Sequence, residues 1–96
     1  MDKSWHVYII INDQGITYTG ITFDTDVKRR IDQHNAGTGA KFTRGKGPWR
    51  LLYQENDFPG RGEAQSRERT IKADPVFKRR LKNAECHDHP LLKTER

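Results

Sequence analysis

The sequence predicts a small α+β domain, with a sheet of three short strands flanked by about three helices. Two short β-branched runs flank a turn within residues 5–34, and a helical stripe with polar members follows them. A third short apolar run comes next, before further stripes with helical spacing. Ninety-six residues leave room for one core, so we expect a single domain over residues 1–84 and a flexible tail over 85–96.

The first two strands are expected to form an antiparallel hairpin. β-branched and aromatic residues dominate the run from Val7 to Asn12, which favours a strand with at least one buried face. Gly15 ends the following turn and is free to adopt positive φ, so residues 16–22 are predicted to return as the partner strand.

The returning strand carries Tyr18 and Gly20 on one face, because side chains two positions apart point the same way. A glycine inside a strand often marks a place where a ligand or another backbone comes close. Tyr8 on the first strand would lie near Tyr18 if the register brings them level. Two phenols would then border the gap at Gly20.

A helix is predicted after the capping candidates at residues 24–26, and it should end at residues 35–37. Two of the four residues on its inward stripe are an arginine and a histidine, although such a stripe is normally apolar. Two explanations remain open: Arg30 and His34 converge on one object beside the hairpin, or both reach past the stripe to water. The stripe consists of Val27, Arg30, Ile31 and His34.

Residues 37–50 are predicted to form a loop with four glycines and four basic side chains. Glycine-rich backbone can approach phosphates closely, and cationic side chains can pair with them. Phe42 and Trp49 either stack on bases or pack into the core. The loop has no Gly-Lys-Ser/Thr ending, so no nucleotide cofactor is expected. The candidate nucleic-acid-binding residues are Lys41, Arg44, Lys46 and Arg50.

The third strand is predicted over residues 51–55, between Pro48 and the turn residues 56–60. A last helix is predicted from Pro75, capped by Asp74. The inward face of this helix is expected to be Phe77, Leu81 and Ala84. Its other positions carry the charged residues Lys78, Arg79, Arg80 and Lys82. These form either a solvated face or an extension of a phosphate-binding surface. Near the end of the chain, Cys86-His87-Asp88-His89 are four potential metal ligands without the spacing of a zinc site.

A helix from Gly62 places Glu68 in the middle of an inward stripe, between Ala64 and Ile71. A lone carboxylate there is costly to bury unless a cation satisfies it. The partner is either an arginine such as Arg30, in an ion pair, or a divalent metal ion, because hard oxygen ligands suit magnesium.

A formal net charge of +5 and a pI near 9.6 point to a polyanionic partner. No run approaches the roughly 20 apolar residues that a membrane-spanning helix needs, and no signal-peptide pattern is expected at the start. One cysteine allows no internal disulfide, which fits a reducing compartment, and we expect a cytoplasmic protein.

Four pieces of the chain, in order from residue 5 to about 82, resemble the GIY-YIG nuclease superfamily. The resemblance is greatest to small stand-alone bacterial members with Tyr-Thr-Gly-Ile-Thr and Gly-Ala-Lys-x-Thr-Arg-Gly signatures. One departure is His6, which stands where the name motif has glycine. The pieces are Tyr8-Ile9-Ile10, Tyr18-Thr19-Gly20, Arg29-Arg30-Ile31-x-x-His34-Asn35, and Arg67-Glu68 with Ile71-Lys72.

This resemblance implies a three-stranded antiparallel sheet flanked by helices and an endonuclease that hydrolyses DNA phosphodiesters with one Mg²⁺ or Mn²⁺ ion. Glu68 would hold the metal, Arg30 would bind the scissile phosphate, and Tyr18 would activate or position the attacking water. Tyr8 and His34 would assist. DNA repair or processing would be the setting, and a protein partner is left open. The alternative is a nucleic-acid-binding module that keeps the fold but cleaves nothing.

Overall fold

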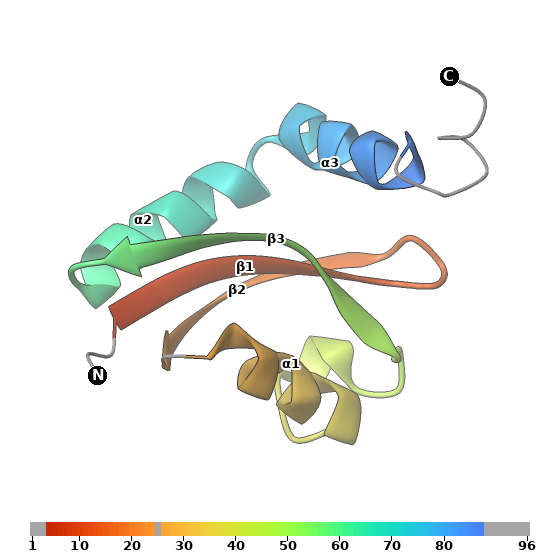
Figure 1. The fold of residues 1–96 in the computed structure, drawn as a ribbon, viewed down its shortest axis with the longest axis horizontal. Coiled ribbons are helices and arrows are strands. Elements are labelled where there is room, and N and C mark those ends of the chain that lie inside the picture. Colours follow the sequence, from red (N-terminus) through yellow and green to blue (C-terminus); the bar gives the residue numbers. More distant parts are fainter. Residues whose placement is uncertain (1–3, 25, 88–96) are drawn as a thin grey trace.

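The computed structural model describes residues 4–24 and 26–87 and contains a three-stranded antiparallel sheet with three α-helices (Figure 1). The strand order is β2-β1-β3, so β1 is central and both neighbours pair with it antiparallel. The predicted fold class is therefore confirmed. In chain order the elements are β1 (Ser4–Asn12), β2 (Thr17–Asp24), α1 (Val27–Ala36), the 3-10 helix η1 (Lys41–Thr43), β3 (Trp49–Phe58), α2 (Arg61–Lys72) and α3 (Pro75–His87).

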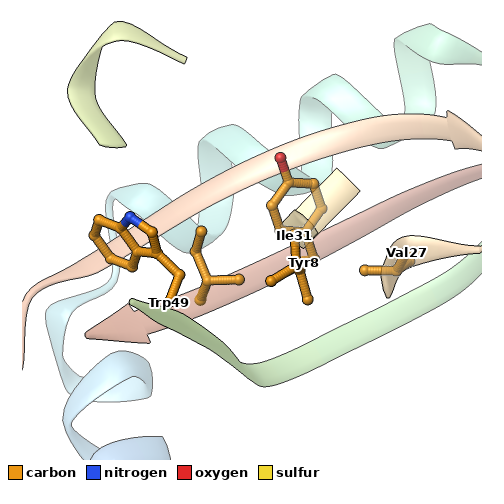
Figure 2. Close-up of a cluster of buried hydrophobic side chains, with 5 residues drawn as sticks. Tyr8, Val27, Ile31 and Trp49 are labelled. Carbon is orange, nitrogen blue, oxygen red and sulfur yellow. The ribbon is translucent and has the colours of Figure 1, made fainter. Parts of the chain in front are cut away.

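The sheet separates two layers of helices: α1 lies on one face, and α2 and α3 lie on the other (Figure 1). Alternation along β1 supplies both cores, because successive side chains point to opposite faces. The α1 side buries Tyr8, Ile10, Val27, Ile31 and Trp49, and the α2 side buries Val7, Ile9, Ala64 and Ile71. Figure 2 shows Tyr8 in the first cluster, with its hydroxyl oxygen at the edge of the group.

The predicted helix ends agree with local chemistry. The Asp26 carboxylate caps α1 by accepting a hydrogen bond from the backbone N–H of Lys28, at 2.9 Å. Gly37 ends α1 in the left-handed conformation, with φ 83°. Asp74 caps α3 by accepting from the backbone N–H of Phe77, at 3.1 Å.

Three details differ from the prediction. β3 runs over Trp49–Phe58 rather than residues 51–55, because it pairs along most of β1 with two register shifts, and Asp57 adopts positive φ near its end. The predicted loop contains η1. Ala84 is exposed because only Phe77 and Leu81 of the α3 stripe pack against the second core cluster.

α3 continues to His87, so it includes the first three residues of the expected tail, and residues 88–96 lie outside the described residues. The tail prediction and its potential metal ligands therefore stay predictions. Over the described ranges, no helix combines the length and apolarity that crossing a membrane requires.

Candidate active site

The hairpin brings two phenols together over a glycine. The β1–β2 register pairs Tyr8 with Gly20, and Tyr18 pairs with Ile10, so the two tyrosines are offset rather than level. Their ring centroids are nevertheless 6.4 Å apart. A Cβ atom on residue 20 would lie 2.6 Å from the Tyr8 hydroxyl oxygen and 3.0 Å from the Tyr18 ring. The absence of a side chain at Gly20 is therefore what lets both rings occupy this place.

His34 connects the hairpin, α1 and the glycine-rich loop. Its Nε2 atom lies 2.7 Å from the Tyr8 hydroxyl, and its Nδ1 atom lies 2.8 Å from Thr43 Oγ1. The single hydroxyl proton of Thr43 is donated to the carbonyl of Ala40, at 2.9 Å. Thr43 can therefore only accept from His34, so we assign the proton to Nδ1 and leave Nε2 to accept from Tyr8.

Burial keeps both members of the Tyr8–His34 pair neutral at physiological pH. Burial and, to a smaller extent, the nearby Arg30 charge together lower the pKa of His34 to about 4. Burial raises the pKa of Tyr8 to about 12, opposed by the Arg30 guanidinium and assisted by Tyr18 and the Glu68 charge. Arg30 and Glu68 thus both act electrostatically on the Tyr8 hydroxyl.

Arg30 and His34 both act on Tyr8 of the hairpin, which agrees with the first of the two explanations for their stripe: His34 by a hydrogen bond and Arg30 through its charge. His34 is only 1% exposed, so it does not reach past the stripe to water. Arg30 is partly buried, and its guanidinium donates to Gln33 Oε1 at 2.6 Å, one turn along the helix. This bond holds a side chain whose remaining N–H groups can face a ligand.

Glu68 comes to the site from α2. Its carboxylate is 19% exposed and is paired with Lys72 on the same helix, at 3.1 Å. The described residues contain no ion pair between Glu68 and Arg30, because α1 and α2 lie on opposite faces of the sheet. Of the two partners considered for Glu68, the arginine is therefore wrong, and a lysine takes its place.

The donor set fits a magnesium ion held by one protein ligand. Glu68 supplies a hard, partly exposed oxygen, and Mg²⁺ commonly keeps several waters beside one or two carboxylates. Lys72 is 51% exposed and can move away from the carboxylate. No cluster of three or more His, Cys, Asp or Glu side chains suited to a metal occurs among the described residues, so an all-protein cage is not formed there.

The four basic side chains of residues 37–50 differ in whether they have a partner within the protein. Lys41 and Arg44 are exposed, and within the described ranges their side chains have no hydrogen-bond or ion-pair partner. Lys46 instead donates to the carbonyl of Phe42 at 2.8 Å, and Arg50 pairs with Asp13 at 3.2 Å. Two of the four predicted nucleic-acid-binding side chains are thus available without breaking an internal contact.

The two aromatic residues of the loop also differ. Trp49 is buried in the first core cluster, and its indole N–H donates to the carbonyl of Thr43 at 3.0 Å. Phe42 is 47% exposed and stacks on Tyr18, with centroids 5.9 Å apart and an interplanar angle of 20°. Core packing is the correct interpretation for Trp49, whereas Phe42 covers one side of the catalytic tyrosine candidate.

Sequence reasoning missed two residues that hold His34. Thr43 anchors its Nδ1 atom, and Gly39 leaves room for the ring, because a Cβ there would lie 2.5 Å from Nδ1. Both lie in the segment that carries the resemblance to the small bacterial members. The signature could have marked Gly39 and Thr43 as important residues, but it does not indicate that this segment contacts α1.

This arrangement defines a catalytic domain of the GIY-YIG type: a hairpin bearing two tyrosines, a first helix bearing arginine and histidine, and a second helix bearing glutamate. Residues 4–82 match the family described as the GIY-YIG catalytic domain. The chain therefore belongs to this family of nucleases, whose members generally use divalent metal ions.

The chain is also similar to proteins named UPF0213. It is 45% identical over 75 residues to one from Nitratidesulfovibrio vulgaris, covering 78% of this chain and 66% of that protein. It is 51% identical over 67 residues to one from Halobacterium salinarum, covering 70% and 83%. A solution NMR structure of a UPF0213 protein from Bacillus halodurans is 40% identical, covers 94% of this chain and 92% of that one, and has a TM-score of 0.47.

Some of these relatives are longer than the part that matches. The chain spans 66% of the Nitratidesulfovibrio protein and 45% of a Sodalis glossinidius relative that is 58% identical over 50 residues. The UPF0213 name states no activity. The assignment to the nucleases therefore rests on the GIY-YIG family, and the substrate and metal ion of this protein are proposed below.

Replacing Gly20 by alanine should destabilise the protein by about 1–3 kcal/mol, because the new methyl group overlaps the Tyr8 hydroxyl and its ring. Urea unfolding of Gly20→Ala measures the change. Gly62→Ala is the matched control, since a Cβ there meets nothing within 4 Å and helical alanine is favoured over glycine. Equal stability of the two variants would contradict the close contact at Gly20.

Removing the Thr43 hydroxyl should allow His34 to adopt both of its neutral tautomers. In Thr43→Val the Nδ1–H group stays buried without an acceptor, which costs about 1–3 kcal/mol, and the ring ¹⁵N shifts should indicate a mixture of tautomers. Thr43→Ser keeps the hydroxyl and should keep one tautomer. If Thr43→Val leaves the ¹⁵N shifts unchanged, the assigned hydrogen-bond direction is wrong.

Stability should depend on pH through His34. Between pH 6.5 and about 4 the unfolded chain binds a proton that the folded protein does not, so the free energy of unfolding falls as the pH is lowered. The slope contributed by this residue is at most about 1.4 kcal/mol per pH unit. Urea unfolding at several pH values should show this slope, and His34→Gln should remove it in the upper part of the window. An unchanged slope in His34→Gln would exclude His34 as its origin.

Proposed function

We propose that this protein is a divalent-metal-dependent endonuclease that hydrolyses DNA phosphodiester bonds in DNA repair or processing. The observation that carries the proposal is the surroundings of the Tyr8 hydroxyl: His34 Nε2 of α1 lies 2.7 Å from it, the Tyr18 ring of β2 lies beside the Tyr8 ring, and the charges of Arg30 and Glu68 act on its pKa. A purely structural cluster has no need for the charges of an arginine and a glutamate, from helices on opposite faces of the sheet, to act on one tyrosine hydroxyl.

Arg30 is assigned to the scissile phosphate. Charge builds on the nonbridging oxygens as water attacks phosphorus, and a guanidinium offers two parallel N–H donors to them. Its bond to Gln33 fixes the side chain beforehand, so little conformational freedom is lost when the phosphate binds.

Tyr18 is assigned to the attacking water, because its side chain is partly exposed whereas Tyr8 is fully buried. Tyr18 orients the water, which gives its proton to solvent, and the Tyr8–His34 hydrogen bond holds the neighbouring ring of Tyr8 in place. The water oxygen then forms a bond to phosphorus, the bond to the leaving oxygen breaks, and solvent protonates that oxygen. Direct deprotonation of Tyr8 beforehand is disfavoured, since its pKa is about 12.

Glu68 would hold the metal ion, which supplies Lewis-acid stabilisation of the phosphoryl charge when it is bound. Its one carboxylate favours a single ion, Mg²⁺ or Mn²⁺. Lys41 and Arg44, exposed beside η1, would bind neighbouring phosphates and position the strand.

Glu68→Ala and Arg30→Ala should each abolish nicking of plasmid or flap DNA in the presence of magnesium while leaving the circular dichroism spectrum unchanged. Glu63→Ala is the matched control, because Glu63 is an exposed acidic residue on the same helix and should keep full activity. Nicking is measured by gel electrophoresis over time.

Equal activity of Glu68→Ala and the unmodified protein would place the chemistry elsewhere. If no substrate is cut but binding is tight and weakens steeply with salt, the protein is a nucleic-acid-binding module that retains the fold.

A further inference from the structure

A second cationic site lies where α3 meets the beginning of β2. A pocket of about 280 Å³ is lined there by Thr17, Pro75, Lys78, Arg79 and Lys82. Three of the five lining residues are cations, one turn or less apart on the same helix. The candidate active site uses none of them.

The positive charge of this pocket is not neutralised by the described part of the chain. Within it, Lys78, Arg79 and Lys82 form no ion pair, and the carboxylate of the adjacent Asp74 is engaged as the cap of α3. Partial burial, with the Lys72 and Lys82 charges, lowers the pKa of Lys78. A half-buried lysine crowded by like charges indicates a place where an anion would relieve the repulsion.

The pocket and the candidate active site share one strand. Thr17 lies three residues before Gly20 on β2, a distance of roughly 10 Å along the strand. Lys72 also links them, because it pairs with Glu68 and its charge is felt by Lys78. Tyr18 packs on the α1 face and the pocket lies on the α3 face, so the DNA strand would pass around the edge strand β2, and its phosphates, which recur about every 3.4 Å, would then reach the pocket.

We propose that this pocket binds the phosphodiester backbone of the DNA strand that flanks the scissile phosphate. The inference rests on the proposed function, since it takes the bound polyanion to be the substrate. A backbone site on α3 gives the chain a second point of attachment, which fixes the direction in which the strand crosses β2.

Binding of labelled duplex DNA to the full chain, followed by fluorescence anisotropy in EDTA over a series of salt concentrations, tests this site. The triple variant Lys78→Ala, Arg79→Ala, Lys82→Ala should reduce the slope of log affinity against log salt by about 2–3, at about 0.9 per lost phosphate contact. The triple control Lys28→Ala, Arg69→Ala, Arg80→Ala removes the same charge from exposed positions outside the pocket and should change the slope by less than about 1.

Arg79→Ala and Arg80→Ala form the sharpest pair, because they are neighbours of the same type on one helix and only Arg79 lines the pocket. Thermal unfolding by circular dichroism verifies that each variant folds. As a measurement that needs no variant, adding duplex DNA should shift the amide NMR signals of residues 78–82.

Equal slopes for the two triple variants, or no DNA binding by the unmodified chain, would overturn this site. So would shifts of residues 78–82 by inorganic phosphate or acidic vesicles but not by DNA. A protein that binds DNA through this pocket yet cuts nothing would keep the inference and refute the nuclease. If the triple variant still nicks DNA and its salt slope is unchanged, the nuclease is kept and the inference about this pocket is refuted.

Discussion

The buried hydrogen bond between Tyr8 and His34 is the interaction on which the rest of the site depends. It joins the central strand to α1, and leaving either partner unpaired would cost about 1–3 kcal/mol. Both rings fit only because Gly20 and Gly39 lack side chains where a Cβ would lie 2.6 and 2.5 Å from them. Two glycines far apart in the sequence are thus required by one polar contact. The bond also explains how a polar pair can occupy a core without a net charge.

A second network positions α2 on the opposite face. Arg67 donates two hydrogen bonds of 2.9 Å to Glu55 on β3, which also accepts one from Tyr53, and the Arg67 hydrogen bonds lower the pKa of Glu55. Glu68 follows Arg67 and is rotated about 100° around the helix axis. Glu68 is therefore turned away from Glu55, and its charge acts on the Tyr8 hydroxyl. The arginine of the Arg67-Glu68 pair therefore orients the helix, and the glutamate is left for the site.

The periodic parts of the chain were predictable, and the contacts between distant segments were not. Alternation along β1 and the spacing of Arg30 and His34 are local patterns, so they indicated the hairpin and the first helix correctly. The hydrogen bond from His34 to Thr43 and the full length of β3 depend on how distant segments of the chain meet, which local sequence patterns do not encode. Ala84 shows the same limit, because helical spacing gives the face of a residue but not whether the sheet extends beneath it.

The Lys72–Glu68 pair decides how the site can respond to a ligand. An exposed ion pair of this kind contributes only about 0–1 kcal/mol, so the ammonium group can leave the carboxylate at little cost. Until then the pair holds the Glu68 carboxylate against the next turn of α2.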